Sequence, residues 1–139
     1  MCLSYLEAYF KEYKNDIDSA DYYWKLVLSN IDSEEGLYYK SHRFLRYTEF
    51  LVRNNRFKDA GKYATSAYEI AKTAKYKEFQ LEAMRLLEQI SLTLKNYKKA
   101  YEYGNECRAL EIGLLTSSKQ EGLLVLELKH EVDRREILQ

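Results

Sequence analysis

One short pattern occurs three times along the chain at a constant spacing of forty residues. In each copy a bulky apolar residue is followed by alanine and then by tyrosine, at intervals of three: Ile17/Ala20/Tyr23, Phe57/Ala60/Tyr63 and Tyr97/Ala100/Tyr103. Self-similarity at a period of a few tens of residues is typical of arrays whose units stack and bury one another's faces. The spacing therefore predicts a repeat array, and it favours a binding scaffold over an enzyme.

The composition agrees with a single helical array. Hydrophobic residues make up 46% of the 139-residue chain, enough for a continuous core. Proline is absent and there are only five glycines, so nothing resembles a flexible linker or a β-rich pattern of turns. Lysine plus arginine equal aspartate plus glutamate at 22 each, which leaves no net basic field to favour nucleic acid. We expect an all-α fold and no nucleic-acid contact by this segment.

Membrane and redox signals are weak. No run approaches the roughly 18 apolar residues of a membrane span, and Lys11 and Lys14 interrupt the region where a signal peptide would have its apolar core. We therefore expect no membrane insertion by this segment. Two cysteines, Cys2 and Cys107, are too few for a disulfide framework. A complete chain would be cytoplasmic, whereas the compartment of an excised fragment stays open.

Apolar residues recur every three and four positions in most segments, which predicts amphipathic helices. The clearest helix extends from Ser33 to Asn54. Asp32 and Glu35 have the spacing of a capping box at its start, and the pair Asn54-Asn55 can take the left-handed conformation that ends it.

The first and last helices are less regular. The apolar residues of the first helix are expected to be Leu3, Leu6, Phe10 and Tyr13. A final helix is expected to begin at Ser118, since Ser118 and Glu121 have the spacing of another capping box. Its apolar residues are Leu124, Leu128 and Val132.

These elements divide the chain into units. The predicted array covers residues 1–115, in three units of about 1–32, 33–75 and 76–115. Residues 116–139 are expected to form a C-terminal capping helix, or a helix that leads into a coiled coil.

The second helices of the second and third units resemble that of the tetratricopeptide repeat, and the helix with Ile17, Ala20, Trp24 and Val27 matches it only in part. The family's pattern of an aromatic residue followed by small residues is met by Phe57, Ala60, Ala64 and Ala67, and by Tyr97, Ala100, Gly104 and Cys107. The chain departs from the family in its longer period, which is typically about 34 residues there, and in lacking the proline that often follows the second helix. The resemblance covers nearly all of residues 1–112. It implies a right-handed α-solenoid of about three hairpins, completed by the capping helix.

In the resembled family, peptides or partner helices lie in a concave groove lined by the first helix of each unit. The resemblance implies that the corresponding positions of this chain bind a partner. These are His42, Leu45, Glu49, Val52 and Arg53 in the second unit, and Glu82, Arg85, Gln89, Leu92 and Thr93 in the third. Arg53 and Arg85 would hold an acidic partner through bidentate contacts.

Tyrosine is unusually abundant, with 14 copies, and it is enriched at interfaces. Tyr38 and Tyr39 are adjacent, so helical geometry turns their side chains apart. We expect one of the two to be exposed and to contact a partner.

The sequence contains no catalytic or metal-binding constellation. Glu127 and His130 have the spacing used in di-iron bundles, but such sites need a second pair and further carboxylates. Nothing suggests a lowered pKa for the Cys107 thiol. There is no glycine-rich phosphate loop and no nucleophile elbow. We expect a protein without enzymatic activity, cofactor or metal.

Two functional hypotheses follow. The first is a non-catalytic protein- or peptide-binding scaffold that uses the concave face of the array. The alternative rests on the stretch from Leu123 to Gln139, which is similar to the helix that leaves the repeat array in bacterial sensor regulators. That similarity implies a sensory or dimerisation segment of a bacterial signal-transduction or transcriptional regulator, with a homodimer formed through the C-terminal helix.

Overall fold

The computed structural model describes residues 2–29 and 36–138. These residues form six α-helices and no strand, which confirms the all-α prediction; the helices are α1 (Cys2–Tyr13), α2 (Ile17–Ser29), α3 (Leu37–Arg53), α4 (Phe57–Ala74), α5 (Lys77–Thr93) and α6 (Tyr97–Leu138). The predicted start at Ser33, with its capping box of Asp32 and Glu35, lies outside the described residues.

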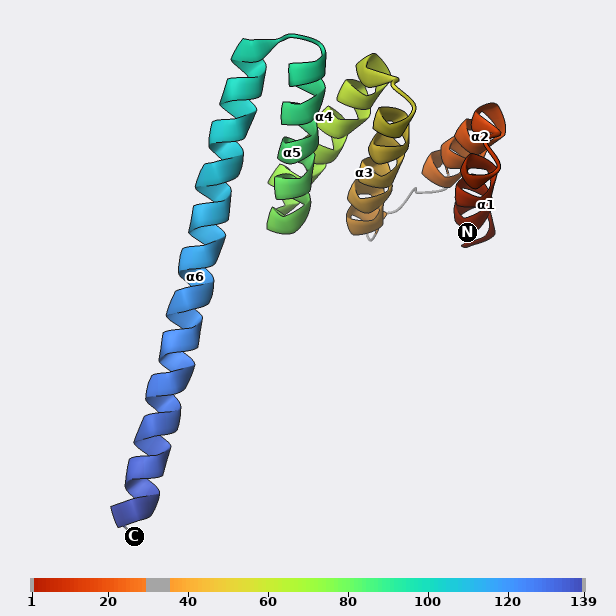
Figure 1. Ribbon diagram of the computed structural model, residues 1–139. Helices are drawn as coiled ribbons and strands as arrows, with labels where there is room; N and C mark the ends of the chain where they lie inside the picture. The colour runs from red at the N-terminus through yellow and green to blue at the C-terminus, as the bar shows by residue number, and fades with distance from the viewer. Residues whose placement is uncertain (1, 30–35, 139) are drawn as a thin grey trace.

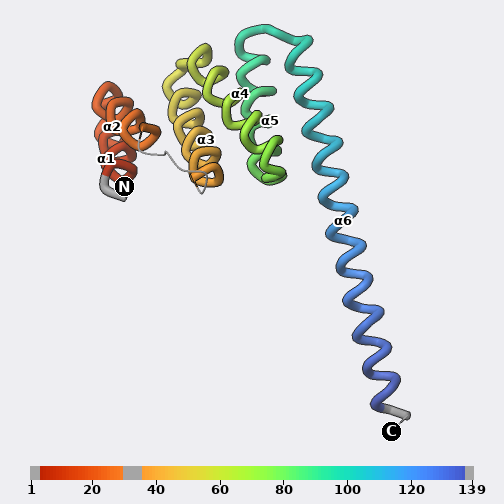
Figure 2. The backbone as a smooth tube through the Cα atoms, turned by 180° about the vertical axis from the view of Figure 1, so that it is seen from behind, coloured from red at the N-terminus to blue at the C-terminus, as the bar shows by residue number. Residues whose placement is uncertain are grey.

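The helices lie in a row, with α1 and α2 at one end and α6 at the other (Figure 1). Helices that follow one another in sequence pack together, and α3 also contacts α5. The view from behind shows that the second half of α6 extends well beyond the other helices (Figure 2). The body of the molecule is therefore built by sequential packing, and the end of α6 projects from it.

Three of the turns repeat at the spacing seen in the sequence. Asn15, Asn55 and Lys95 each have a left-handed backbone, with φ values of 62°, 61° and 61°. After each one, the next amide donates a hydrogen bond of 2.8 Å to the carbonyl five residues earlier. Asparagine tolerates this conformation better than most residues. The prediction that Asn54-Asn55 ends a helix is confirmed at Asn55.

Alanine at the repeated position allows the paired helices to approach closely. Ala20 and Ala60 are fully buried, and Ala100 is nearly so. The tyrosines three residues further on are partly buried against the core: Tyr23, Tyr63 and Tyr103. Both sets of residues therefore serve the packing of the helices.

The largest cluster of the core surrounds Trp24 on α2, which is fully buried. The Trp24 ring lies 5.3 Å from the Tyr5 ring on α1 and 6.3 Å from the Phe50 ring on α3, measured between centroids. A residue of this size stands here where α4 has Ala64. It fills the space between α1, α2 and α3 and so ties the first hairpin to the rest of the row.

The prediction of a separate final helix beginning at Ser118 is wrong. A single helix of 42 residues, α6, runs through this position. Serine and threonine lower helix propensity only slightly, and residues 116–118 contain no proline. Nothing in this stretch is therefore strong enough to end the helix.

The predicted apolar face of the first helix is also wrong. Leu6, Phe10 and Tyr13 are exposed, whereas Tyr5 and Ala8 lie in or against the core. The side chain of Leu3 lies outside the described residues. The core-facing side of α1 is instead formed by Ala8 together with Tyr5 and Tyr9, whose ring centroids lie 5.3 and 5.2 Å from that of Trp24.

Candidate functional site

Five rings gather where α3 and α5 begin, and we call them the aromatic cluster. Three come from the first turns of α3, one from the turn before α5 and one from the start of α5: Tyr38, Tyr39, His42, Tyr76 and Phe79. The two helices contact each other, so their starts bring the rings together.

Tyr38 is the centre of the aromatic cluster. Its ring centroid lies 4.8 Å from that of Phe79, 5.5 Å from that of Tyr76 and 5.6 Å from that of Tyr39. Aromatic pairs at such distances contribute about 0.5–1.5 kcal/mol each beyond their buried area. The neighbouring rings therefore hold Tyr38 in one orientation even though it reaches solvent.

Both adjacent tyrosines are exposed, Tyr38 by 50% and Tyr39 by 54%, so the expectation that only one faces solvent is wrong. They belong to the first turn of α3. Beside them is a pocket of about 200 Å³, lined by Tyr38, Tyr76, Lys77, Glu78 and Phe79. The cluster thus combines fixed rings with a small recess.

His42 supplies a neutral ring to this cluster. Burial lowers the pKa of His42 below its ordinary value, and the positive charge of Arg46 lowers it further. An imidazole with a lowered pKa is uncharged at neutral pH. Its ring centroid lies 6.0 Å from that of Phe79, so it acts here as part of an apolar surface.

Charged side chains connect the first helices of successive hairpins. Arg53 on α3 donates to both carboxylate oxygens of Glu12 on α1, at 2.9 and 2.7 Å. Asn54 donates to the same carboxylate at 3.3 Å. Arg53, predicted to hold an acidic partner, therefore already has a bidentate carboxylate partner within the chain.

Two further contacts belong with it, one from α3 to α5 and one from α5 to α6 within the third hairpin, and together we call the three the ion-pair row. Arg46 on α3 contacts Glu82 on α5 at 2.5 Å. Arg85 on α5 donates to Glu111 on α6 at 2.5 and 3.2 Å. Arg85, like Arg53, is therefore satisfied by a carboxylate of the neighbouring helix.

Glu49 lies beside the ion-pair row, 3.1 Å from Arg46. Burial raises the pKa of its carboxyl, and the charge of Arg46 opposes this effect. Glu49 therefore belongs to the same charged network and is not a free surface group.

The remaining predicted residues separate into core and surface. Leu45 is fully buried and packs with Ala67 and Ala83, so it cannot line a groove and that assignment is corrected. Gln89 and Thr93 are exposed on α5, where the Thr93 hydroxyl donates to the Gln89 carbonyl at 3.0 Å.

Reasoning from the sequence missed Tyr76, Phe79, Glu12 and Glu111. The repeat could have identified Phe79, because it lies forty residues after Tyr39. The two glutamates carry no comparable signal, since acidic residues are common on helix surfaces and their partners lie 41 and 26 residues away.

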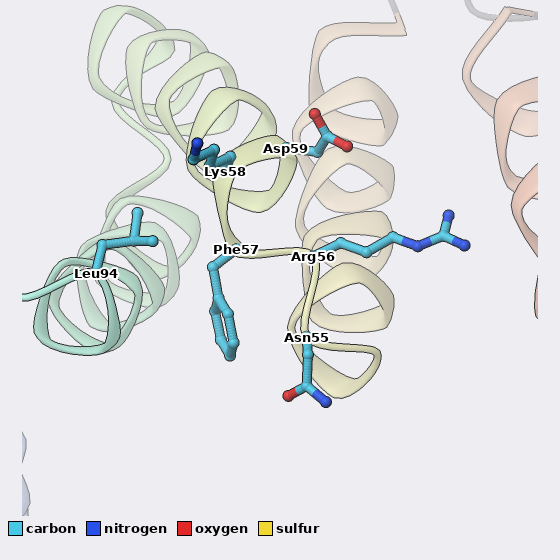
Figure 3. Close-up of a pocket in the computed structure, with 6 residues that line it drawn as sticks. All are labelled: Asn55, Arg56, Phe57, Lys58, Asp59 and Leu94. Atoms are coloured by element: carbon cyan, nitrogen blue, oxygen red, sulfur yellow. The ribbon is translucent and has the colours of Figure 1, made fainter.

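A second recess, of about 380 Å³, lies at the turn between α3 and α4, opposite Leu94 at the end of α5. Arg56 points away from Phe57 and Leu94, toward α2 (Figure 3), where it contacts Asp21 at 3.8 Å. The polar groups of this recess do not converge on one point, so it lacks the arrangement typical of a reactive site.

Within residues 2–29 and 36–138, no three His, Cys, Asp or Glu side chains are placed to hold a metal ion. Burial raises the pKa of the Cys107 thiol, and the charge of Glu111 adds to this shift. A raised pKa makes a thiol less reactive. No helix in the described part of the chain is long and apolar enough to cross a membrane.

Comparison of the chain with protein-family models, with curated proteins and with solved structures gave no match.

Proposed function

We propose that the chain is a non-catalytic protein- or peptide-binding scaffold, folded as a right-handed α-solenoid of tetratricopeptide-like hairpins. Support for the repeat comes from two features that share the forty-residue period. These are the left-handed turns at Asn15, Asn55 and Lys95 and the buried alanines of the paired helices. Arrays of this kind expose extended surfaces suited to binding.

The aromatic cluster is the observation that carries the proposed binding role. Tyrosine combines a large apolar area with a polar tip, and aromatic residues dominate the energetics of interfaces. Because the rings around Tyr38 already fix its position, little conformational entropy is lost when a partner binds. The proposed ligand is a peptide segment that inserts an apolar side chain into the recess lined by Tyr38, Tyr76 and Phe79.

The ion-pair row argues against a ligand recognised mainly by charge. An acidic ligand would have to displace Glu12 from Arg53, or Glu111 from Arg85. Each displacement would leave a carboxylate without its partner. We therefore place recognition at the rings, with the ion-pair row fixing the spacing of the helices that present them.

The test is a selection from a displayed library of random peptides on the folded chain, followed by titration of the selected peptides. Tyr38→Ala and Tyr39→Ala should each weaken binding by about tenfold, a typical loss for an interface tyrosine. Tyr22→Ala is the matched control, because this tyrosine on α2 is exposed by 59% and lies outside the cluster. Failure to enrich any peptide, or equal losses for all three variants, would refute the proposal.

The second candidate function is a sensory or dimerisation segment of a bacterial regulator. It is favoured by the projecting half of α6, where every described side chain from Leu115 to Glu136 is exposed. Leu124, Leu128 and Val132 lie on this half at helical spacing. We propose that these apolar residues meet those of a second copy in a coiled coil.

Disulfide trapping tests this second role in a variant whose own cysteines are replaced by Cys2→Ser and Cys107→Ala. Leu124→Cys should cross-link two chains on mild oxidation, since the same core position faces itself in a parallel pair. Gly122→Cys lies on the opposite side of the helix and should not. Equal yields from the two positions, or none from Leu124→Cys, would contradict the coiled coil.

A further inference from the structure

The two ends of the helical row expose side chains whose counterparts inside the row are buried. Phe10 on α1, Phe50 on α3 and Ile90 on α5 are separated by forty residues each. Phe50 is fully buried and Ile90 is 3% exposed, whereas Phe10 is 51% exposed. Phe50 packs on Trp24 of α2, and Ile90 would lie 3.7 Å from a Cβ at Gly61 of α4. Inside the row this side chain is therefore covered by the preceding hairpin, whereas on α1 it is half exposed, with the ammonium of Lys14, just after the helix, 5.6 Å from its ring centroid.

At the opposite end of the row, α6 exposes a face that is covered in α4. Forty residues after Gly61 is Tyr101 on α6, which is 69% exposed. Forty residues after the partly buried Phe57 is Tyr97, which is also exposed. The face of α4 that carries Gly61 is covered by α5, whereas the same face of α6 has no helix on it in the described part of the chain.

Polar groups at the two ends also match. At the junction between α2 and α3, the Tyr47 hydroxyl donates to the Asp21 carboxylate at 2.5 Å. Forty residues before Tyr47 is Glu7 on α1, and eighty residues after Asp21 is Tyr101 on α6. The two ends thus carry the same hydroxyl and carboxylate pair, with donor and acceptor exchanged.

We propose that copies of this chain associate head to tail, with α1 of one copy packed on the outer face of α6 of the next. Phe10 covers Tyr101 in this contact, and Glu7 accepts a hydrogen bond from the Tyr101 hydroxyl. The contact joins two different surfaces, so every added copy leaves a free end and assembly continues. It is separate from the coiled coil proposed for the end of α6 and from the peptide site.

Sedimentation velocity tests the contact in the full chain carrying Leu124→Glu and Leu128→Glu. These two changes prevent association through the apolar residues of the projecting half of α6, so any remaining association has another cause. The weight-average mass should rise with protein concentration. Adding Phe10→Glu or Tyr101→Glu should stop this rise, whereas Tyr22→Glu, the exposed control on α2, should not. Far-UV circular dichroism checks that each variant is folded. If a glutamate variant does not fold, Phe10→Ser or Tyr101→Ser replaces it.

Mixing the two end variants gives the decisive result. The Phe10 variant keeps an intact α6 end and the Tyr101 variant keeps an intact α1 end, so an equimolar mixture should form a one-to-one dimer of twice the monomer mass. The proposal would be overturned if the chain carrying only Leu124→Glu and Leu128→Glu stayed monomeric at every concentration. It would also be overturned if the mixture formed no dimer, because a contact between two different surfaces must be restored when each variant supplies the surface that the other lacks.

Discussion

At the scale of single residues, close packing of the helix pairs depends on alanine at the position that repeats every forty residues. Ala60 has no exposed surface, and in α4 it is followed by the buried Ala64, Ala67 and Ala71. Small side chains in such a stripe let the neighbouring helix approach, and they leave no space for a larger residue.

Ala60→Leu should therefore destabilise the protein. Extra methylene groups in a filled core typically cost about 1–3 kcal/mol of unfolding free energy. Urea denaturation measures the change. Ala109→Leu makes the same substitution at an exposed position on α6 and should change the unfolding free energy by less than about 0.5 kcal/mol. Similar values for the two variants would show that the stripe is not tightly packed.

The ion-pair row makes a prediction about pH at the same scale. Hydrogen bonds from Arg85 hold the pKa of Glu111 below its usual value. The contribution of this contact is therefore complete above the unfolded-state pKa of about 4.3, and it disappears as the pH falls through the lower folded-state pKa.

Glu111→Gln should lower stability near neutral pH and have little effect in strong acid, which makes the acid limb of the stability profile shallower. Urea unfolding at a series of pH values gives this profile. Glu121→Gln, an exposed residue on the projecting half of α6, should leave the profile unchanged. If the profile of Glu111→Gln ran parallel to that of the unsubstituted protein, the contact with Arg85 would not persist in solution.

At the scale of elements, α6 differs most from its prediction. A helix of 42 residues is about 63 Å long, more than twice the length of α5. Its first part packs on α5 and its second part has no neighbour in the described chain. Continuity through Ser118 gives the projecting half a fixed direction relative to the body.

Lys119→Pro distinguishes one continuous helix from two. If a new helix began after Ser118, proline would occupy its first position, where it is favoured. In a continuous helix, proline removes a hydrogen bond and clashes with the preceding turn, at a cost of about 3 kcal/mol. We expect Lys119→Pro to lose a clear part of the helical signal in far-UV circular dichroism. Lys119→Ala is the control and should retain the full signal.

The elements of the hairpins could be predicted from the sequence because local signals specify them. The Asn54-Asn55 pair located the end of α3, and the recurrence of apolar residues every three and four positions predicted the helices. The contacts between hairpins could not be predicted in this way. Glu12 and Arg53 are 41 residues apart, and only the packed helices bring them together. For the same reason Tyr38 and Tyr39 were found as candidates, but the cluster with Tyr76 was not.

At the scale of the whole molecule, an array of stacked units should be least stable at its ends, because terminal units have one neighbour each. Amide hydrogen exchange followed by mass spectrometry should show the slowest exchange in α3, α4 and α5. Faster exchange is expected in α1, α2 and the projecting half of α6. Uniform protection along the chain would instead indicate one cooperative domain.

The central claim is that the aromatic cluster binds a peptide, and amide chemical-shift mapping by NMR with a selected peptide tests it most directly. We predict that the largest shifts fall in residues 37–43 and 76–82, at the starts of α3 and α5. Saturable shifts confined instead to α2, or to the projecting half of α6, would contradict the claim.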